Sequence, residues 1–454
     1  MATRSERWSG GAGFVLATIG SAVGLGSIWK FPYEVGSNGG SVFVLFYLVG
    51  LALIVVPLML AELAIGRRGQ SDARTSIANV ALTYGASPYW SAIGAWGIAI
   101  AVLILSFYSV IGGWALAYAV DTAWLGLLEP RADVAQARFD ALLTSLPRMV
   151  AYHTAFMAIT ALIVARGIAG GIETACKILM PVLVVLMIVL TVYSLIEGDI
   201  GTTLGFLFAL DTDKLTARAA LEALGLGFFS IGVGMATMIT YAAYAGREIN
   251  LRAAAFITVL GDTVISLLAG FMVFPIVFAN DLNPSSGPGL LFVTLPLAFA
   301  TVPFGTIAAT VFFVLLVLAA LASAISMLEM PVALIRRAFG WSRPLATLVC
   351  ACVCWIVGFA SVFSFNLWAS WFPLAALPSF AKSTVFDLLD HLTSNVMLPI
   401  AGFALALFVG WSLPSRFLVE ELQLGHAAAA IVRALLRYVA PVAIAAVGLA
   451  PLIV

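Results

Sequence analysis

Long apolar segments dominate this sequence and limit what it can fold into. Eleven of them approach or exceed the roughly 20 residues that a helix needs to cross a lipid bilayer. They are residues 12–36, 41–66, 88–124, 149–166, 174–196, 219–245, 253–279, 303–335, 344–364, 386–412 and 431–453. Because the hydrocarbon core offers no water to unpaired backbone groups, such segments fold as helices. We predict an all-α integral membrane protein with one transmembrane domain over residues 1–454.

Composition and charge exclude several classes of protein. Hydrophobic residues make up 63% of the chain and charged residues 10%, which excludes a soluble domain. A net charge of zero gives nucleic-acid binding no support. The sequence has no phosphate loop or metal-ligand spacing, and His153, His391 and His426 pair with no nucleophile motif. We therefore expect a protein that is not an enzyme.

The basic residues predict the orientation of the chain. Fifteen of the 22 lysines and arginines fall on the side of the N-terminus, so this side is expected to face the cytoplasm. Eleven spans then place the C-terminus on the periplasmic or extracellular side. The first eleven residues are polar, so no cleavable signal peptide is expected. The absence of Asn-x-Ser/Thr sequons fits a bacterial inner-membrane protein.

Two of the apolar segments are interrupted by glycine. The first segment contains Gly24 and Gly26, and the sixth contains Gly232 and Gly234. Glycine in a helix interior costs about 1 kcal/mol relative to alanine, so it needs a reason. A packing seam between helices would explain the first interruption alone. Paired interruptions in corresponding positions instead indicate the broken helices of a secondary transporter, with a binding site near the membrane midplane.

Four acidic residues within or at the edge of the apolar segments are candidates for a special role, because an unpaired charge is costly in the membrane. Glu173 has Lys177 four residues later, which indicates a structural pair. Glu62 and Glu329 fit either an internal hydrogen-bond network or a functional role. Asp262 has no basic partner nearby, so we expect it to coordinate a cation. The hydroxyls near the breaks are either packing serines or further cation ligands: Ser27, Ser230, Ser323 and Ser326.

Two connecting segments are long enough for structure of their own. Residues 125–148 are polar and amphipathic, and we expect a surface helix there. Residues 280–302 combine a Pro/Gly/Ser turn with a short apolar run. We expect them to form a re-entrant or capping loop over an outer vestibule.

Residues 20–40, GSAVGLGSIWKFPYEVGSNGG, resemble the first transmembrane segment of the neurotransmitter:sodium symporter family. They are similar to its bacterial amino-acid transporters, such as the leucine transporter. The resemblance continues through residues 57–66, 108–114, 166–181, 228–244, 262–275, 318–331 and 386–411. It implies the leucine-transporter fold, with inverted repeats at residues 12–196 (spans 1–5) and 219–412 (spans 6–10), broken helices 1 and 6, and an eleventh span at 431–453.

The resemblance also implies a substrate site. The substrate carboxylate would meet backbone N–H groups at Leu25 and Gly26 and the hydroxyl of Tyr108. Members that carry monoamines have an aspartate at the position of Gly24, so glycine here implies a substrate with its own carboxylate. The implied contacts are Ala22, Gly24, Leu25, Gly26, Ile104, Tyr108, Ile111, Phe229, Ser230, Gly232, Met235, Ser323 and Met327. Gly232 removes bulk and Met235 adds a flexible thioether, which suggests room for a large apolar or aromatic amino acid.

Two sodium sites and three gating elements follow from the same resemblance. The first site would use Ala22, Ser27, Ser230 and Asp262, and the second would use Gly20, Val23, Ala319, Ala322 and Ser323. The gates would be Lys30 with Asp390 on the outer side, Trp8 with Tyr244 on the inner side, and the unwinding motif of Gly171 and Pro181.

The sequence departs from the family pattern at several of these positions. Ser27 stands where the family usually has asparagine, so a hydroxyl replaces an amide oxygen at the first sodium site. Ala322 stands where the family has threonine or serine and removes a side-chain oxygen from the second. Lys30 replaces an arginine, and Arg336 and Arg337 stand where an acidic partner of the inner gate is expected. The inner gate is therefore expected to close differently.

We interpret the chain as a sodium-coupled symporter that imports a neutral amino acid, hydrophobic or aromatic, by alternating access. Asp262 stands where chloride-dependent relatives have asparagine, so one or two sodium ions but no chloride are expected to be required. The alternatives are a divergent member with one sodium or altered coupling that carries another small amino acid or an amino-sulfonate, and a membrane sensor or channel. The expected partners are the substrate and the bilayer, and a homodimer is one oligomeric state that the sequence leaves open.

Overall fold

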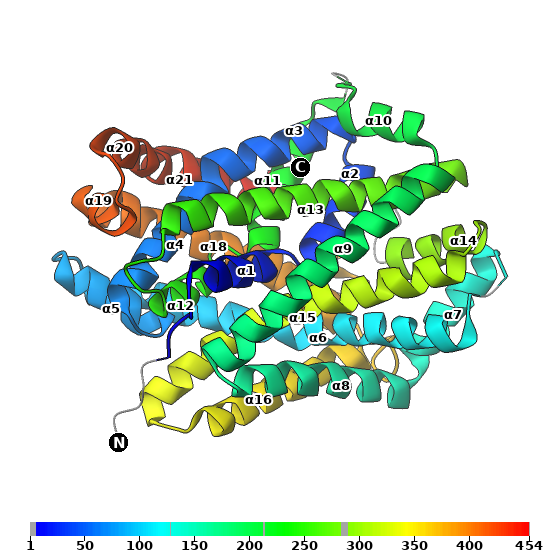
Figure 1. The fold of residues 1–454 in the computed structure, drawn as a ribbon, viewed down its shortest axis with the longest axis horizontal. Coiled ribbons are helices and arrows are strands. Elements are labelled where there is room, and N and C mark those ends of the chain that lie inside the picture. The colour runs from blue at the N-terminus through cyan, green and yellow to red at the C-terminus, as the bar shows by residue number, and fades with distance from the viewer. Residues whose placement is uncertain (1–5, 128, 212–213, 283–288, 454) are drawn as a thin grey trace.

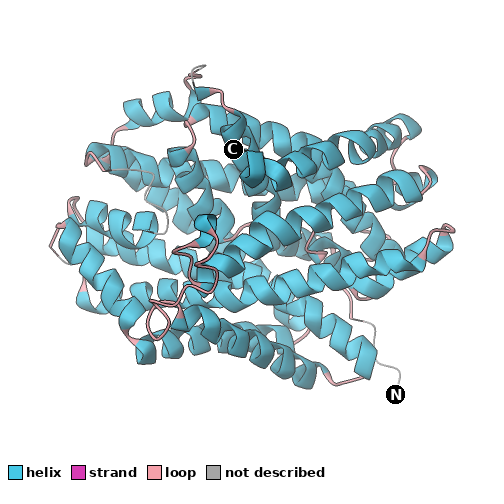
Figure 2. Ribbon diagram, turned by 180° about the vertical axis from the view of Figure 1, so that it is seen from behind, coloured by secondary structure: helices cyan, strands magenta, loops and turns pink. Residues whose placement is uncertain are grey.

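The computed structural model describes residues 6–127, 129–211, 214–282 and 289–453, and all regular elements in these ranges are helices (Figures 1 and 2). Among the residues in these ranges, nine helices are long and apolar enough to cross a membrane. They are Ser41–Gly69 (α3, α4), Pro88–Leu125 (with α6, Ala92–Leu125), Leu146–Ala165 (α8), Ile168–Glu197 (with α9, Thr174–Glu197), Leu251–Ala279 (α13), Gly305–Phe339 (α15), Arg343–Phe363 (α16), Val385–Ser412 (α17, α18) and His426–Gly448 (α20 and the start of α21). The shorter or component helices are α3 (Ser41–Gly50), α4 (Val56–Gly69), α5 (Ala73–Thr83), α7 (Ala132–Thr144), α10 (Ile200–Phe208), α14 (Leu295–Ala300), α17 (Val385–His391), α18 (Leu398–Leu407), α19 (Arg416–Leu422), α20 (His426–Ala434) and α21 (Ala440–Ile453).

Two further segments are broken helices, as the glycine pairs predict. Helix α1 (Gly11–Ala22) and the segment Gly26–Ser37, which ends in α2 (Phe31–Ser37), meet at an angle of 51°. Helix α11 (Ala217–Ile231) is separated from α12 (Thr237–Ala243) by residues 232–236. With the first pair counted as one span, the described residues hold ten candidate spans, one fewer than the eleven expected. Helices α11 and α12 lie where the sixth span is expected, but each is too short to cross a membrane by itself.

The second break depends on glycine for its backbone geometry. Gly232 and Gly234 have φ angles of 71° and 92°, a left-handed region that side chains make costly. Ala236 also lies in this region, with φ of 65°, and the helix resumes at the next residue. The helix therefore stops and restarts within five residues, which exposes backbone polar groups inside the protein.

The long helices run side to side in Figure 1, and small helices gather at both ends. Helices α5 and α19 lie at the same end as α12. Trp8 bonds to Tyr241 on α12, so we call this end the Trp8 side. Helices α7, α10 and α14 lie at the opposite end, which we call the Lys30 side. Helix α7 confirms the surface helix that was expected within residues 125–148.

Candidate substrate and sodium site

The carboxylate of Asp262 is the polar centre between the two broken helices. It is fully buried on α13 and accepts hydrogen bonds from the hydroxyls of Ser27 (2.5 Å), Ser230 (3.1 Å) and Tyr47 (3.0 Å). The hydroxyl oxygens of Ser27 and Ser230 lie 3.1 Å apart. The structure thus brings together the three side chains expected at the first sodium site. Sequence reasoning missed Tyr47, whose only signal is a hydroxyl within an apolar segment.

A second group of oxygens lies where α1 ends against α15. The hydroxyl of Ser323 lies 3.4 Å from the carbonyl oxygen of Gly20 and 3.2 Å from that of Val23. A β-carbon at Gly20 would lie 3.4 Å from the methyl group of Ala322. Ala319 is buried one turn before Ser323 on the same helix. The structure therefore brings Ser323 together with the carbonyls of Gly20 and Val23, and it places the Ala322 methyl group beside Gly20.

Tyr108 and Gly24 define the expected position of the substrate carboxylate. The N–H group of Leu25 donates to the hydroxyl oxygen of Tyr108 at 3.1 Å. A β-carbon at Gly24 would lie 2.4 Å from the hydroxyl oxygen of Ser323 and 2.8 Å from that of Tyr108. No side chain can be accommodated at position 24 without displacing these groups. In this bond the Tyr108 oxygen accepts, so the Tyr108 O–H can still donate to another acceptor.

A cavity of about 670 Å³ opens above this centre on the Lys30 side. Four of the expected substrate contacts line it, namely Leu25, Tyr108, Ile111 and Phe229. The other contacts are buried and are not among its lining residues: Ala22, Gly24, Gly26, Ile104, Ser230, Gly232, Met235, Ser323 and Met327. Segment Leu290–Ala300 packs instead against α7 and α6, with Phe292 stacked on Phe139. The expected capping loop therefore does not line the cavity with the residues that the structure describes.

The expected outer gate spans this cavity as a single ion pair. The ammonium of Lys30 lies 3.4 Å from a carboxylate oxygen of Asp390 and 4.0 Å from the centre of the Phe229 ring. The two charged side chains keep 23% and 35% of their surface exposed. Pairs this exposed contribute little, about 0.2–1 kcal/mol.

The Trp8 side is closed by the N-terminal segment. The indole N–H of Trp8 donates to the carbonyl oxygen of Tyr241 at 2.9 Å, and Trp8 is buried. The hydroxyl of Tyr244 donates to Glu329 at 2.8 Å. Glu329, on α15, also forms an ion pair with Arg343 at the start of α16. The two expected gate residues, Trp8 and Tyr244, therefore both lie in the closure.

The acidic partner on this side comes from the N-terminal segment itself. Glu6 forms ion pairs with Arg343 and, at 2.9 Å, with Arg336. Arg337 points elsewhere and lies 3.8 Å from Asp72. The gate thus has its charges reversed relative to the family pattern, which explains why arginine stands where an acid was expected. Neither Glu6 nor Arg343 was singled out from the sequence.

The unwinding motif is wound in this structure. Gly171 lies in a π-helical turn, Ile168–Glu173, and Pro181 lies inside the continuous helix α9. Glu173 pairs with Lys177 at 2.7 Å, as its spacing predicted. It also accepts the backbone N–H of Ser9 at 2.8 Å, which ties the N-terminal segment to α9.

Glu62 supports the second break. Its fully buried carboxylate on α4 accepts the N–H groups of Gly234 (2.7 Å) and Met238 (3.2 Å). A carboxylate is favourable there because the first N–H groups of α12 have no partner within the helix. Of the two interpretations left open for Glu62, the structure favours the internal network.

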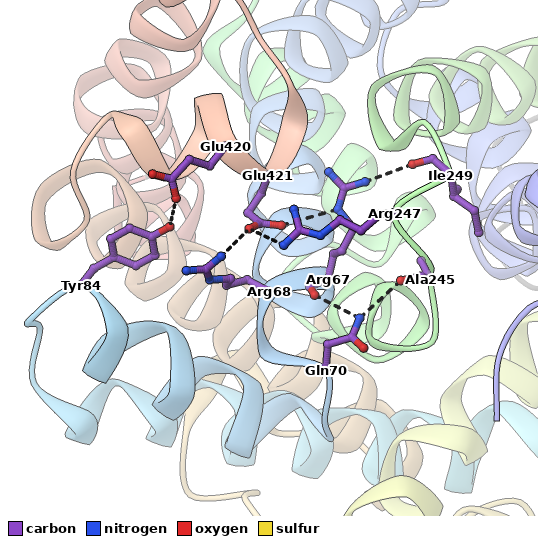
Figure 3. Close-up of polar contacts among 9 residues, drawn as sticks. All are labelled: Arg67, Arg68, Gln70, Tyr84, Ala245, Arg247, Ile249, Glu420 and Glu421. Carbon is purple, nitrogen blue, oxygen red and sulfur yellow. Dashed lines mark hydrogen bonds and ion pairs between the residues drawn. The ribbon is translucent and has the colours of Figure 1, made fainter. Parts of the chain in front are cut away.

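A second charged cluster ties α19 to the rest of the Trp8 side (Figure 3). The fully buried carboxylate of Glu421 lies 3.6 Å from Arg67, 3.3 Å from Arg68 and 3.5 Å from Arg247. Arg67 is itself buried, whereas Arg247 is mostly exposed. One carboxylate on α19 therefore joins α4 to the segment after α12.

Beside this cluster, the hydroxyl of Tyr84 donates to Glu420 at 2.6 Å (Figure 3). Partial burial and the hydrogen bond to Glu420 raise the pKa of Tyr84 to about 12. The hydroxyl is therefore protonated, and able to donate, at neutral pH.

The family model of the sodium:neurotransmitter symporter family matches residues 5–127 and 143–454. This chain belongs to that family. Sodium:neurotransmitter symporters are transporters, so the protein is a sodium-dependent, multi-pass membrane transporter and not an enzyme. Its two broken helices and its likeness to a solved member give it the leucine-transporter fold.

Individual relatives agree with this assignment. A sodium-dependent transporter of Bacillus subtilis is 36% identical over 446 residues, which cover 96% of both chains. One of Methanocaldococcus jannaschii is 30% identical and covers 89% of this chain and 82% of its own length. The crystal structure of MhsT in complex with L-phenylalanine has a TM-score of 0.90 and 40% identity, and covers 98% of this chain and 99% of that chain.

Proposed function

We propose that this symporter imports a neutral amino acid, hydrophobic or aromatic, together with sodium by alternating access. The observation that supports it best is the hydroxyl of Tyr108, which accepts the N–H of Leu25 and keeps its own proton for a carboxylate. The Lys30 side would face the periplasm or exterior and the Trp8 side the cytoplasm, in the inner membrane of a bacterium. Residues 12–196 and 219–412 would be the two inverted repeats.

The character of the side-chain pocket supports an apolar substrate. Ile104, Ile111 and Met327 are buried, and Phe229 lies below Lys30. Gly232 leaves space that the Met235 methyl group occupies, since a β-carbon at Gly232 would lie 2.6 Å from it. A thioether adapts its shape easily, so Met235 can move aside for a large side chain. MhsT, which is similar, holds L-phenylalanine in its crystal structure.

A single-sodium variant of this function is the second candidate. It is favoured by Ala322, which supplies no oxygen to the second site. Such a member would carry another small amino acid or an amino-sulfonate.

Binding and uptake measurements test the proposal. Purified protein is screened by thermal shift with the twenty amino acids, in sodium and in potassium, and the best ligand is then tested for uptake into proteoliposomes. We expect saturable, sodium-dependent uptake of an apolar amino acid. Tyr108→Phe should weaken substrate binding at least about tenfold, because a hydrogen bond to a charged group contributes roughly 1.5–3 kcal/mol. Unchanged affinity would remove Tyr108 from the carboxylate site.

Chloride replacement tests the role proposed for Asp262. Cations close together in a site of low dielectric repel each other, and the fixed charge of Asp262 offsets this repulsion. We expect wild-type uptake to be unchanged when gluconate replaces chloride. Asp262→Asn should be inactive or should require chloride. A wild type that stops without chloride would contradict the proposal that Asp262 is the built-in counter-charge.

A further inference from the structure

Three carbonyl oxygens at the end of α1 face a single hydroxyl group. The carbonyl oxygens of Gly20, Ser21 and Val23 lie 3.4, 3.3 and 3.2 Å from the hydroxyl of Ser323. A hydroxyl carries one proton, so it can satisfy only one of the three. The last carbonyls of a helix also lack N–H partners and carry partial negative charge. Three such oxygens around one hydroxyl form a cradle suited to a cation.

Position 322 does not complete this cradle. The Ala322 methyl group faces Gly20, and it can neither accept nor coordinate. The next polar group along the same face of α15 is Ser326, three residues after Ser323. A missing oxygen at 322 is therefore followed by an additional hydroxyl one turn nearer the Trp8 side.

Ser326 and Ser21 face each other with their lone pairs available. Their hydroxyl oxygens lie 3.0 Å apart, with Ser21 as the donor. Ser326 directs its own proton to the carbonyl oxygen of Ser323 at 2.7 Å. Both protons are thus used, which leaves the oxygen of Ser21 free to coordinate and one lone pair on Ser326.

A buried and unsatisfied hydroxyl points to the same place. The Tyr241 hydroxyl faces Ser326, is fully buried, and makes no hydrogen bond of ordinary geometry within the residues that the structure describes. Leaving such a group unpaired costs about 1–3 kcal/mol, so a polar partner beside Ser326 would be favourable. A cation with its bound water would provide one.

We propose that the second sodium ion binds closer to the Trp8 side than the family pattern places it. Its ligands would be the hydroxyls of Ser21, Ser323 and Ser326 and the carbonyl oxygens of Gly20 and Ser21. Hard cations prefer oxygen ligands such as these. This site, which we call the Ser326 site, rests on the proposed sodium coupling and replaces the ligand lost at Ala322. Ser21 keeps part of its surface exposed, whereas Ser326 is buried.

The test measures sodium-dependent thermal stabilisation of the purified protein, with potassium keeping the ionic strength constant. To remove the first site, the titration is also made in an Asp262→Asn background. In that background, we expect Ser326→Ala and, separately, Ser21→Ala to raise the half-saturating sodium concentration about tenfold or more. Ser361→Ala, a buried serine on α16, is the matched control and should leave it unchanged.

A rescue separates coordination from helix packing. Ala322→Thr restores the family's oxygen, so Ala322→Thr with Ser326→Ala should return the half-saturating concentration to within about threefold of the parent. A hydrogen bond between helices that only aids packing would not be rescued by an oxygen at another position. If Ser326→Ala and Ser21→Ala leave the titration unchanged while Ser323→Ala weakens it, the Ser326 site is wrong and the family position is used. A wild type that shows no sodium response would overturn the proposed sodium coupling itself.

Discussion

The two ends of the transport path are closed by very different amounts of electrostatic contact. On the Lys30 side, one ion pair with partly exposed partners spans a cavity of about 670 Å³. On the Trp8 side, Glu329 is fully buried, Arg343 is almost so, and Glu6 joins Arg343 to Arg336. Exposed pairs contribute about 0.2–1 kcal/mol, whereas breaking a buried one costs roughly 3–5 kcal/mol. The Trp8 side is therefore held by stronger electrostatic contacts than the Lys30 side.

The largest effect is expected from Arg343→Gln, which leaves Glu329 buried without a cation. Loss of roughly 3–5 kcal/mol would open the Trp8 side and raise its accessibility at least about a hundredfold. Cys176 reports this, because it is buried near Tyr241 and Glu173. The measurement is its labelling rate by a water-soluble maleimide, with the other three cysteines replaced.

Arg252→Gln on the same side serves as the control and should label like the parent. If Arg343→Gln lowers the unfolding midpoint without faster labelling of Cys176, the network stabilises the fold and does not set the closure.

A smaller loss is expected from Glu421→Gln, which leaves Arg67 buried against two other arginines. We expect the free energy of unfolding to fall by about 2–5 kcal/mol, since an unpaired buried charge remains. The measurement is chemical unfolding of the purified protein. Glu420→Gln is the matched control, because Glu420 is the exposed neighbour that only accepts from Tyr84. Equal effects of the two changes would show that burial of Glu421 contributes nothing.

Glu6→Gln should have an intermediate effect on closure. Glu6 keeps 25% of its surface exposed, and a glutamine can still accept from one of the two arginines. We expect labelling of Cys176 to rise about tenfold, corresponding to roughly 1.5 kcal/mol for a charge-assisted hydrogen bond. An increase as large as that of Arg343→Gln would show that the N-terminal acid, and not the Glu329–Arg343 pair, holds this side closed.

The smallest effect is expected from Lys30→Gln on the opposite side. Its pair with Asp390 contributes about 0.2–1 kcal/mol, so substrate dissociation should accelerate less than about fivefold. Lys30→Arg should slow it slightly, because a guanidinium can bind a carboxylate with two hydrogen bonds. Dissociation of a radiolabelled substrate measures both, and Arg218→Gln, in the same cavity, is the control. A hundredfold acceleration by Lys30→Gln would remove the contrast between the two sides.

The sequence alone was sufficient for the features that depend on local chemistry. Apolar length predicted the spans, and the glycine pairs at 24/26 and 232/234 predicted both breaks, because a helix interior penalises glycine wherever it lies. The spacing of Glu173 and Lys177 likewise predicted their pairing, since residues four apart share a helix face.

The tertiary structure alone decided which distant polar groups meet. Tyr47 reaches Asp262 across 215 positions, Glu62 reaches Gly234 across 172, and Glu6 reaches Arg343 across 337. Nothing in local periodicity records such partners, because the free energy that pairs them comes from burying charges and hydroxyls together once the helices have packed. For the same reason, the sequence alone indicated that the inner gate lacks an acidic residue. The structure shows that Glu6, near the N-terminus, supplies that acid to Arg336 and Arg343.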